Sequence, residues 1–303
     1  MEEKFSRPKG FGQILDHTFS LSKTHFKDFF LILLIFMGPV YLLQALVQWA
    51  SGVSFFREVG TGDNWFDQMV NSFDETQQPV NVAGDLGIAL VGFIMLFLAP
   101  VAGAAIMIAI DRVRKGESYT VGSVIKQAFS RYGPMLGSTI LYGIIAFALF
   151  IVPLIITVLA GIFGAFIDPA FGIISAILLF IGFGIGMGLL LTRWSLYFGS
   201  VVFKEDTPGL NRSWMLTRGR TWVLFGLYIV FSLIVMAISV AMEMTFGMLL
   251  GNSVLLSLII NFVSIFTTLI FTVGYAVMYF DAKLRYDADD LKAMIDDYQA
   301  PKI

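Results

Sequence analysis

Six long apolar stretches constrain this chain more than any other feature of its sequence. A helix needs about 20 predominantly apolar residues to cross the hydrocarbon core of a bilayer. Stretches of this size occupy residues 29–50, 86–110, 134–160, 170–192, 222–250 and 253–280. Strands of a membrane barrel would instead alternate weakly over about ten residues. The sequence therefore predicts an all-α integral membrane protein in which residues 1–303 form a single six-span domain.

The composition also favours a membrane protein, because 57% of the residues are hydrophobic and only 14% are charged. Soluble domains carry about 25% charged residues. Residues 1–28 contain acidic side chains and lack the short apolar core and cleavage site of a signal peptide, so we expect the first span to anchor the chain itself. The absence of cysteine excludes disulfides, thiolate metal sites and cysteine nucleophiles.

Basic residues fall on alternate connections between the predicted spans. Of the 20 lysines and arginines, 18 lie in residues 1–28, 111–133, 204–221 and 281–303. The other two are Arg57, in an outer connection, and Arg193, at the end of the fourth span. Because cytoplasmic loops carry an excess of positive charge, this pattern predicts a protein of the bacterial cytoplasmic membrane with both termini in the cytoplasm.

Three cytoplasmic segments resemble one another. They contain ILDHTF at 14–19, VIKQAF at 124–129 and GLNRSW at 209–214, and each precedes a pair of spans. This order predicts three weak copies of one unit, made of a surface helix, an outward span and an inward span. In the amphipathic N-terminus, residues 1–28, the predicted apolar face consists of Phe11, Ile14, Leu15, Phe19 and Phe26. Such interfacial helices anchor a protein in the headgroup layer, and their cations can also bind lipid phosphates or a partner.

Cations and indoles concentrate where the fifth span begins. An indole suits the membrane interface because it is apolar with one hydrogen-bond donor, and a guanidinium group can bind phosphate while its stem stays in apolar surroundings. Together with the end of the fourth span, this segment forms the candidate site for an anionic lipid headgroup. The candidate residues are Arg193, Trp194, Arg212, Trp214, Arg218, Arg220 and Trp222.

The fourth span is longer than one bilayer requires, because its apolar sequence continues to Phe203. If about 22 residues cross the hydrocarbon, Arg193 lies near the inner interface, and the turns after it need cover from other parts of the protein. Within the span, Gly182 with Gly186 and Gly184 with Gly188 have the spacing of small residues that lets helices approach closely. We therefore expect a helix contact at these glycines.

Two acidic segments flank the spans. The outer loop, residues 51–85, has one basic and six acidic residues, and residues 63–73 have the spacing of an amphipathic helix. This loop is interpreted as a solvated surface or as an attractor of cationic peptides or ions. The cytoplasmic tail, residues 281–303, is also acidic and is either a frayed end or a helix. Its helical interpretation rests on the i, i+3, i+4, i+7 spacing of Leu291, Met294, Ile295 and Tyr298.

Sequence motifs of catalysis are missing. There is no HExxH motif, phosphate-binding P-loop or nucleophile elbow, and His17 and His25 are too far apart to chelate a metal as an i, i+4 pair. We expect no catalytic residue, metal or cofactor. Glu243 is the only carboxylate well inside a span, so it needs a polar partner such as Asn261, protonation or water. An alternative function is therefore small-solute or proton-coupled transport through Glu243.

Residues 193–222 resemble the signature of a bacterial multi-pass family typified by the membrane domain of glycerophosphoryl diester phosphodiesterases. An arginine–aromatic pair ends one span, an acidic turn with Pro and Gly follows, and a segment similar to RSW-x-L-T-x-G-x-x-W starts the next span. The N-terminal FGQILDHTFSLSKTHF also resembles the opening helix of that family. Only 23 residues follow the sixth span, too few for the catalytic barrel of some relatives. The resemblance implies the membrane architecture without phosphodiesterase activity.

These observations predict a non-enzymatic membrane protein. We expect it to bind membrane lipids with anionic headgroups or another amphiphile, or to serve a membrane-protein partner, for example in envelope stress or antimicrobial-peptide resistance. Nothing in the sequence indicates binding to nucleic acid.

Overall fold

The computed structural model describes residues 5, 7–56, 82–251 and 253–299. Every regular element in these ranges is a helix, so the predicted all-α class is confirmed. The long helices are α3 (Phe26–Ala50), α5 (Val82–Arg114), α7 (Tyr132–Ile167), α8 (Pro169–Trp194), α11 (Thr221–Leu250) and α12 (Val254–Gln299). The short helices are α2 (Phe11–Thr24), α6 (Val121–Phe129), α9 (Tyr197–Val202) and α10 (Leu210–Leu216).

Six of these helices are long and apolar enough to cross a membrane. Each predicted span lies within one of them, except that Ser253 precedes the first residue of α12. The order of a short helix followed by two long helices occurs three times, with α9 as an additional element. The chain is therefore a multi-pass membrane protein by the length and composition of its helices.

Local capping explains where two of the helices begin. Thr120 and Ser123 form a reciprocal capping box at the start of α6. The Asp168 carboxylate accepts hydrogen bonds from the backbone N–H groups of Ala170 at 2.8 Å and Phe171 at 3.1 Å, where α8 begins. These side chains satisfy N–H groups that have no partner within their own helix.

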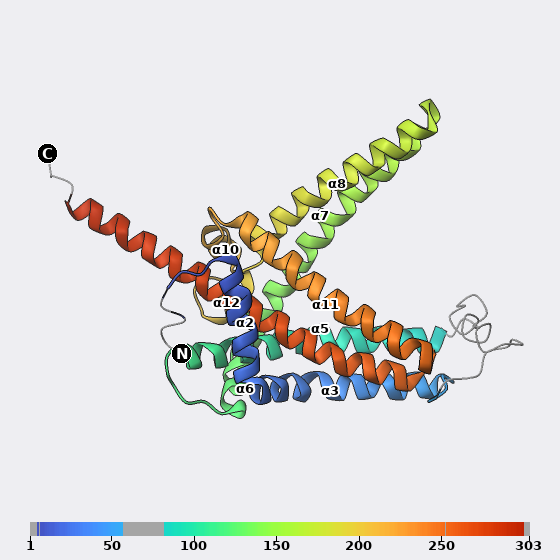
Figure 1. The fold of residues 1–303 in the computed structure, drawn as a ribbon, viewed down its shortest axis with the longest axis horizontal. Helices are drawn as coiled ribbons and strands as arrows, with labels where there is room; N and C mark the ends of the chain where they lie inside the picture. The colour runs from blue at the N-terminus through green and yellow to red at the C-terminus, as the bar shows by residue number, and fades with distance from the viewer. Residues whose placement is uncertain (1–4, 6, 57–81, 252, 300–303) are drawn as a thin grey trace, which may run out of the picture. The chain divides into compact units, whose positions relative to one another are not determined.

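The chain divides into two compact units, which are described separately. The first contains Gly12–Ser130 and Ile229–Val277, and the second contains the segment through Phe11, Arg131–Tyr228 and the chain from Met278. In the first unit, α3 packs against α5 and lies beside α12 (Figure 1). Phe30 of α3 contacts the rings of Phe262 and Phe266 of α12 at centroid distances of 5.8 and 5.1 Å.

The α2 helix of the first unit packs one face against the protein and leaves the large rings of its predicted apolar face partly exposed. Its buried residues are Ile14, His17, Thr18, Leu21 and Ser22. The large rings of Phe19 and of Phe26, which follows the helix, remain 40% and 38% exposed. Ile14 of the predicted apolar face is fully buried, and the Phe26 ring stacks on Phe266 at a centroid distance of 5.6 Å. The location of the rest of this face in the headgroup layer stays a prediction.

In the second unit, α7 and α8 form an antiparallel hairpin (Figure 1). Their closest approach involves Gly164 and Gly172, because a Cβ atom added to Gly164 would lie 2.8 Å from the Cα atom of Gly172. The predicted contact at residues 182–188 is largely wrong. Gly188 faces the Phe225 ring, whereas Gly182 and Gly184 have no atom of the described residues within 4 Å of an added Cβ.

The apolar sequence after Arg193 forms a separate buried helix. After α8 ends, α9 places Tyr197 and Val201 in the interior, with exposed fractions of 7% and 0%. Gly199 allows the Tyr279 ring of α12 to lie against it, since an added Cβ would be 2.4 Å from that ring. The expected protein cover over this segment is therefore present.

The C-terminal segment is helical as far as Gln299, which favours the helical interpretation over a frayed tail. The side chains at 291–298 that predicted this helix lie outside the described residues. The expected helix at 63–73 in the acidic outer loop also lies outside them.

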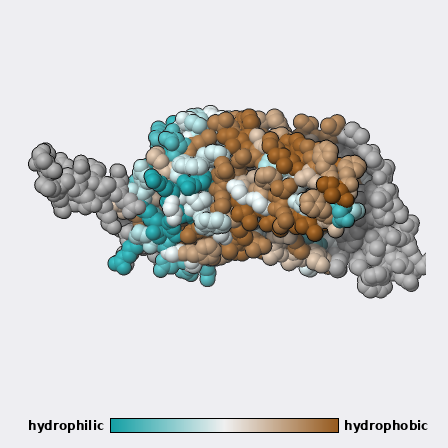
Figure 2. Space-filling view, turned by 90° about the horizontal axis from the view of Figure 1, so that it is seen from above, coloured by the Kyte–Doolittle hydropathy of each residue, from teal (hydrophilic) through white to brown (hydrophobic). Residues whose placement is uncertain are grey.

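Hydrophobic side chains cover much of the face that Figure 2 shows, and most of its hydrophilic side chains gather on the left of that view. Large apolar residues of the α7–α8 hairpin are strongly exposed, including Phe147 at 67%, Phe163 at 64% and Leu178 at 65%. Contiguous apolar surface of this kind is unfavourable in water. It is the surface expected of helices in contact with lipid chains.

Candidate functional site

A pocket of about 430 Å³ lies in the second unit, where the end of α8 meets α10 and the start of α11. We call it the arginine–tryptophan pocket. It is lined by Gly186, Leu189, Leu190, Arg193, Trp214, Gly219, Arg220, Thr221, Trp222 and Val223. The structure therefore brings together four of the seven predicted site residues, namely Arg193, Trp214, Arg220 and Trp222.

Hydroxyl groups on and directly after α10 hold the end of α8. Ser213 Oγ donates to the backbone oxygen of Arg193 at 2.9 Å, and Thr217 Oγ1 lies 3.2 Å from the same oxygen and 2.9 Å from the backbone oxygen of Ser213. Ser213 Oγ also accepts a hydrogen bond from the backbone N–H of Leu196 at 3.0 Å. Both hydroxyl-bearing residues are fully buried. These bonds satisfy backbone groups at a helix C-terminus and fix α10 beside Arg193.

The Arg193 guanidinium group lies over an indole ring. Its Cζ atom is 4.5 Å from the centroid of the Trp214 ring, a cation–π contact. Among the residues that the structure describes, Arg193 has no carboxylate partner. Trp194 does not line the pocket, but its ring contacts Trp214 at a centroid distance of 5.8 Å. Arg193 is thus positioned by a ring and keeps its charge available to an anion.

A left-handed turn brings the start of α11 to the pocket. Gly219 has φ 78°, a conformation that favours glycine because a side chain would be strained there. The following residues Arg220, Thr221 and Trp222 line the pocket. Trp222 is 65% exposed and Trp214 is 40% exposed, so both indoles can contact a ligand as well as the protein.

Arg220 also belongs to a buried ion cluster. Its Nη1 atom lies 2.8 Å from Oδ2 of Asp281, a carboxylate that is only 4% exposed. Asp281 also accepts hydrogen bonds from Nε of Arg285 at 3.1 Å and from the backbone N–H of Lys9 at 2.7 Å. Arg285 Nη2 donates in turn to the backbone oxygen of Lys9 at 2.8 Å. The cluster ties the N-terminal segment to α12 within this unit.

Burial and the neighbouring Arg285 lower the pKa of Arg220, and Asp281 opposes them. Arginine side chains are effectively always protonated, so Arg220 stays charged at neutral pH. Because one carboxylate faces two guanidinium groups, the cluster keeps a net positive charge beside the pocket.

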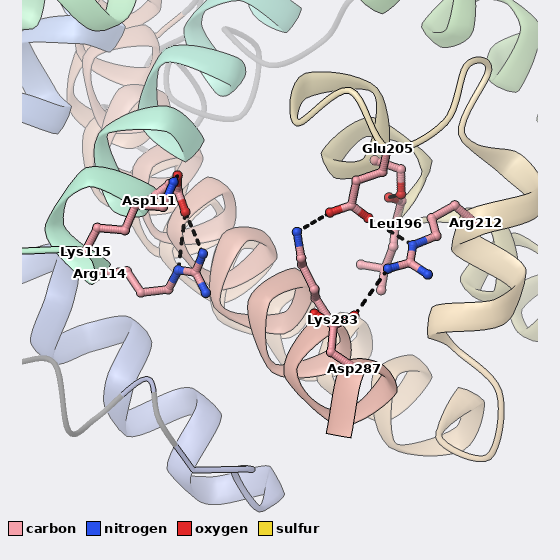
Figure 3. Close-up of polar contacts among 9 residues, drawn as sticks. Asp111, Arg114, Lys115, Leu196, Glu205, Arg212, Lys283 and Asp287 are labelled. Carbon is pink, nitrogen blue, oxygen red and sulfur yellow. Dashed lines mark hydrogen bonds and ion pairs between the residues drawn. The ribbon is translucent and has the colours of Figure 1, made fainter. Parts of the chain in front are cut away.

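Arg212 is paired elsewhere in the same unit. Its Nε atom lies 2.9 Å from Glu205 Oε2, its Nη2 atom lies 3.5 Å from Asp287 Oδ1, and its guanidinium group stacks over Tyr286. Lys283 binds the second oxygen of Glu205, which therefore points between the two cations (Figure 3). Arg212 is thus neutralised within the protein and does not line the pocket.

Hydrogen bonds set the charge state of Glu205. Burial would raise the pKa of this carboxyl, but hydrogen bonds from Lys283 and Arg212 outweigh burial and hold the pKa below its usual value. This network was not predicted, because Glu205 and Lys283 are 78 residues apart in the sequence. Ser213 and Thr217 belong to the family-like segment at 212–222, but their hydrogen bonds to the Arg193 carbonyl were not predicted.

Arg218 is exposed and does not line the pocket. It forms no ion pair with a residue in the described part of the chain. The seven predicted residues therefore divide into pocket residues, the paired Arg212, the supporting Trp194 and the exposed Arg218.

The predicted intramembrane polar site is not assembled as expected. In the first unit, Asn261 Nδ2 donates to Gln44 Oε1 at 3.2 Å, and the hydroxyls of Tyr41 and Ser264 lie 2.7 Å apart. Glu243 is exposed on α11 and makes no hydrogen bond or ion pair with any residue that the structure describes. Asn261 is thus satisfied by α3, a partner that the sequence analysis did not identify.

The described ranges contain no group of three or more His, Asp and Glu residues placed to hold a metal ion. Comparisons with protein-family models, curated proteins and solved structures find no match to this chain.

Proposed function

We propose that the protein binds the anionic headgroup of a membrane lipid, or of a similar amphiphile, in the arginine–tryptophan pocket and catalyses no reaction. The observation that carries this proposal is the arrangement of Arg193. It lies on the Trp214 ring, without a carboxylate partner among the described residues, and shares a pocket of about 430 Å³ with Arg220 and Trp222.

The chemistry of these side chains fits a phosphate-bearing headgroup. A guanidinium group presents a planar fork of donors that can bind phosphate oxygens in pairs. Each cation near an anionic leaflet contributes about 1 kcal/mol of attraction. The two tryptophans suit the boundary between headgroups and lipid chains. Together these features favour an anionic amphiphile over a neutral solute.

The location of the pocket agrees with the proposed topology. In that topology, the protein lies in a bacterial cytoplasmic membrane with its termini in the cytoplasm, because basic residues concentrate on alternate connections. The pocket lies at the end of α8 that is followed by the basic segment 204–221. It would therefore face the headgroups of the inner leaflet.

Native mass spectrometry of the protein in mild detergent tests the proposal. We expect phosphatidylglycerol retention to fall about fivefold in Arg193→Gln, because removal of the unpaired cation of the pocket loses about 1 kcal/mol of attraction. Arg193→Lys keeps the charge but loses the planar fork and the full ring contact, so we expect an intermediate loss.

Lys126→Gln is the matched control, because Lys126 is an exposed cation on α6 outside the pocket. This variant should retain lipid like the wild type. Equal retention in all variants would contradict a specific site. Full retention in Arg193→Lys alone would show that positive charge suffices without guanidinium geometry.

A further inference from the structure

A second concave site lies in the first unit, between α11 and α12. This groove has a volume of about 320 Å³ and is lined by Ser232, Val235, Met236, Thr267, Thr268 and Phe271. The two helices run antiparallel beside each other (Figure 1). Three of its six lining residues are apolar and three carry hydroxyl groups, and none of them lines the arginine–tryptophan pocket.

Close helix packing limits the groove on one side. The Phe231 ring lies against Gly274, where an added Cβ would be 2.6 Å from that ring. Gly274 lies three residues beyond Phe271 on α12, which corresponds to about 4.5 Å along the helix. The helices therefore meet just beyond the groove on the side nearer Trp222, and an apolar chain entering the groove must come from the opposite direction.

A carboxylate stands in that opposite direction. Glu243 follows Ser232, Met236 and Ser239 on one face of α11, at the i, i+4, i+7, i+11 spacing of a helix. It lies about 10 Å along the axis from Met236 and about 30 Å from Trp222, at 1.5 Å per residue. Glu243 is thus separated from Trp222 by about the thickness of the hydrocarbon core.

With Trp222 in one headgroup layer, as the proposed topology has it, this length of helix puts Glu243 near the opposite boundary of the membrane. It is exposed and has no hydrogen bond or ion pair with any residue in the described ranges. A carboxylate at the edge of a low-dielectric region attracts a cation strongly, because the interaction is less screened than in bulk water. The carboxylate and the groove therefore complement an amphiphile. Its cationic head would lie beside Glu243 at the boundary, and its apolar chain would enter the groove about 10 Å deeper.

We propose that Glu243 and the α11–α12 groove bind a single-chain amphiphile whose headgroup is a protonated amine. The ammonium group pairs with Glu243, and the chain lies between Met236 and Phe271, which are 62% and 36% exposed. The charge of Glu243 argues against an anionic lipid in this groove. The site is independent of the proposed phosphate pocket.

Electron spin resonance with chain-labelled probes tests this site. The purified full-length protein is placed in phosphatidylcholine vesicles with spin-labelled stearylamine, stearyl alcohol or stearyl sulfate. Chains held by the protein give a motionally restricted signal. We expect stearylamine to show about fivefold higher relative affinity than stearyl alcohol, and stearyl sulfate to show the lowest.

Two carboxylate variants separate a specific site from general surface charge. Glu243→Gln should abolish the preference for the amine, whereas Glu243→Asp should keep most of it. Asp168→Asn is the matched control, because it removes another carboxylate while asparagine still caps α8. An amine preference that persists in Glu243→Gln, or that is lost equally in Asp168→Asn, would overturn the proposal.

A third variant tests the groove itself. Ser232 is exposed on α11 and lines the groove, so Ser232→Leu should fold while filling part of the space. We expect it to weaken the retention of stearylamine severalfold with Glu243 intact. Undiminished retention would show that the amine meets the carboxylate without its chain entering the groove, which contradicts the proposed site.

Discussion

At the residue scale, the pocket depends on a serine that carries no charge. The buried Ser213 hydroxyl donates to the Arg193 carbonyl and accepts from the Leu196 N–H group. Ser213→Ala leaves both backbone groups without this partner, and a buried group left unpaired costs about 1–3 kcal/mol. We expect a loss of that size in the free energy of unfolding in detergent. Ser130→Ala, at an exposed serine, should change it by less than about 0.5 kcal/mol. Equal effects would contradict the bridging role of Ser213.

Glu205 gives the same unit a predictable response to acid. Its pKa is held below the usual value because hydrogen bonds from Lys283 and Arg212 outweigh burial. A depressed pKa contributes stability above the unfolded-state pKa of about 4.3, and this contribution is lost as the pH falls through the lower folded-state pKa. Thermal unfolding between pH 6 and pH 3 should therefore show a decline below about pH 4.3. Glu205→Gln should be less stable at pH 6 and should decline less. Parallel curves would contradict this assignment.

At the scale of elements, the packing of the α7–α8 hairpin depends on Gly172 more than on the glycine motif at residues 182–188. A Cβ at Gly172 would lie 2.6 Å from the backbone nitrogen of Ala165 and 2.7 Å from the backbone oxygen of Gly161. Backbone atoms cannot turn away as a side chain can, so Gly172→Ala should cost about 1–3 kcal/mol of unfolding free energy through overpacking. Gly184→Ala meets no described atom within 4 Å and should be neutral or slightly stabilising. Chemical unfolding in detergent compares the two, and a larger loss in Gly184→Ala would contradict the observed packing.

The same elements show how far the sequence could predict the structure. The spans were predictable because apolar length and charge spacing are local properties of a chain. The glycine contacts were not, because small-residue spacing shows where a helix permits close approach but not which helix faces it. The pocket was partly predictable for a similar reason. Interfacial chemistry identified Arg193 and Trp214, whereas the pairing of Arg212 with Asp287, 75 residues away, depends on tertiary structure.

At the scale of the whole molecule, the strongest prediction concerns orientation in the membrane. Because the chain contains no cysteine, each introduced cysteine reports one position. Cysteines at Ser51 and Ser72 should react with an impermeant thiol reagent in intact bacterial cells, since the acidic loop 51–85 is predicted to lie outside. Ser118 and Ser130 are exposed in the structure and lie in a basic connection, so each position suits an introduced cysteine. Cysteines there should react only after the membrane is permeabilised, which also shows that both sites are reactive. Reversed labelling would place the arginine–tryptophan pocket in the outer leaflet and Glu243 at the cytoplasmic boundary, and would contradict the topology inferred from basic residues.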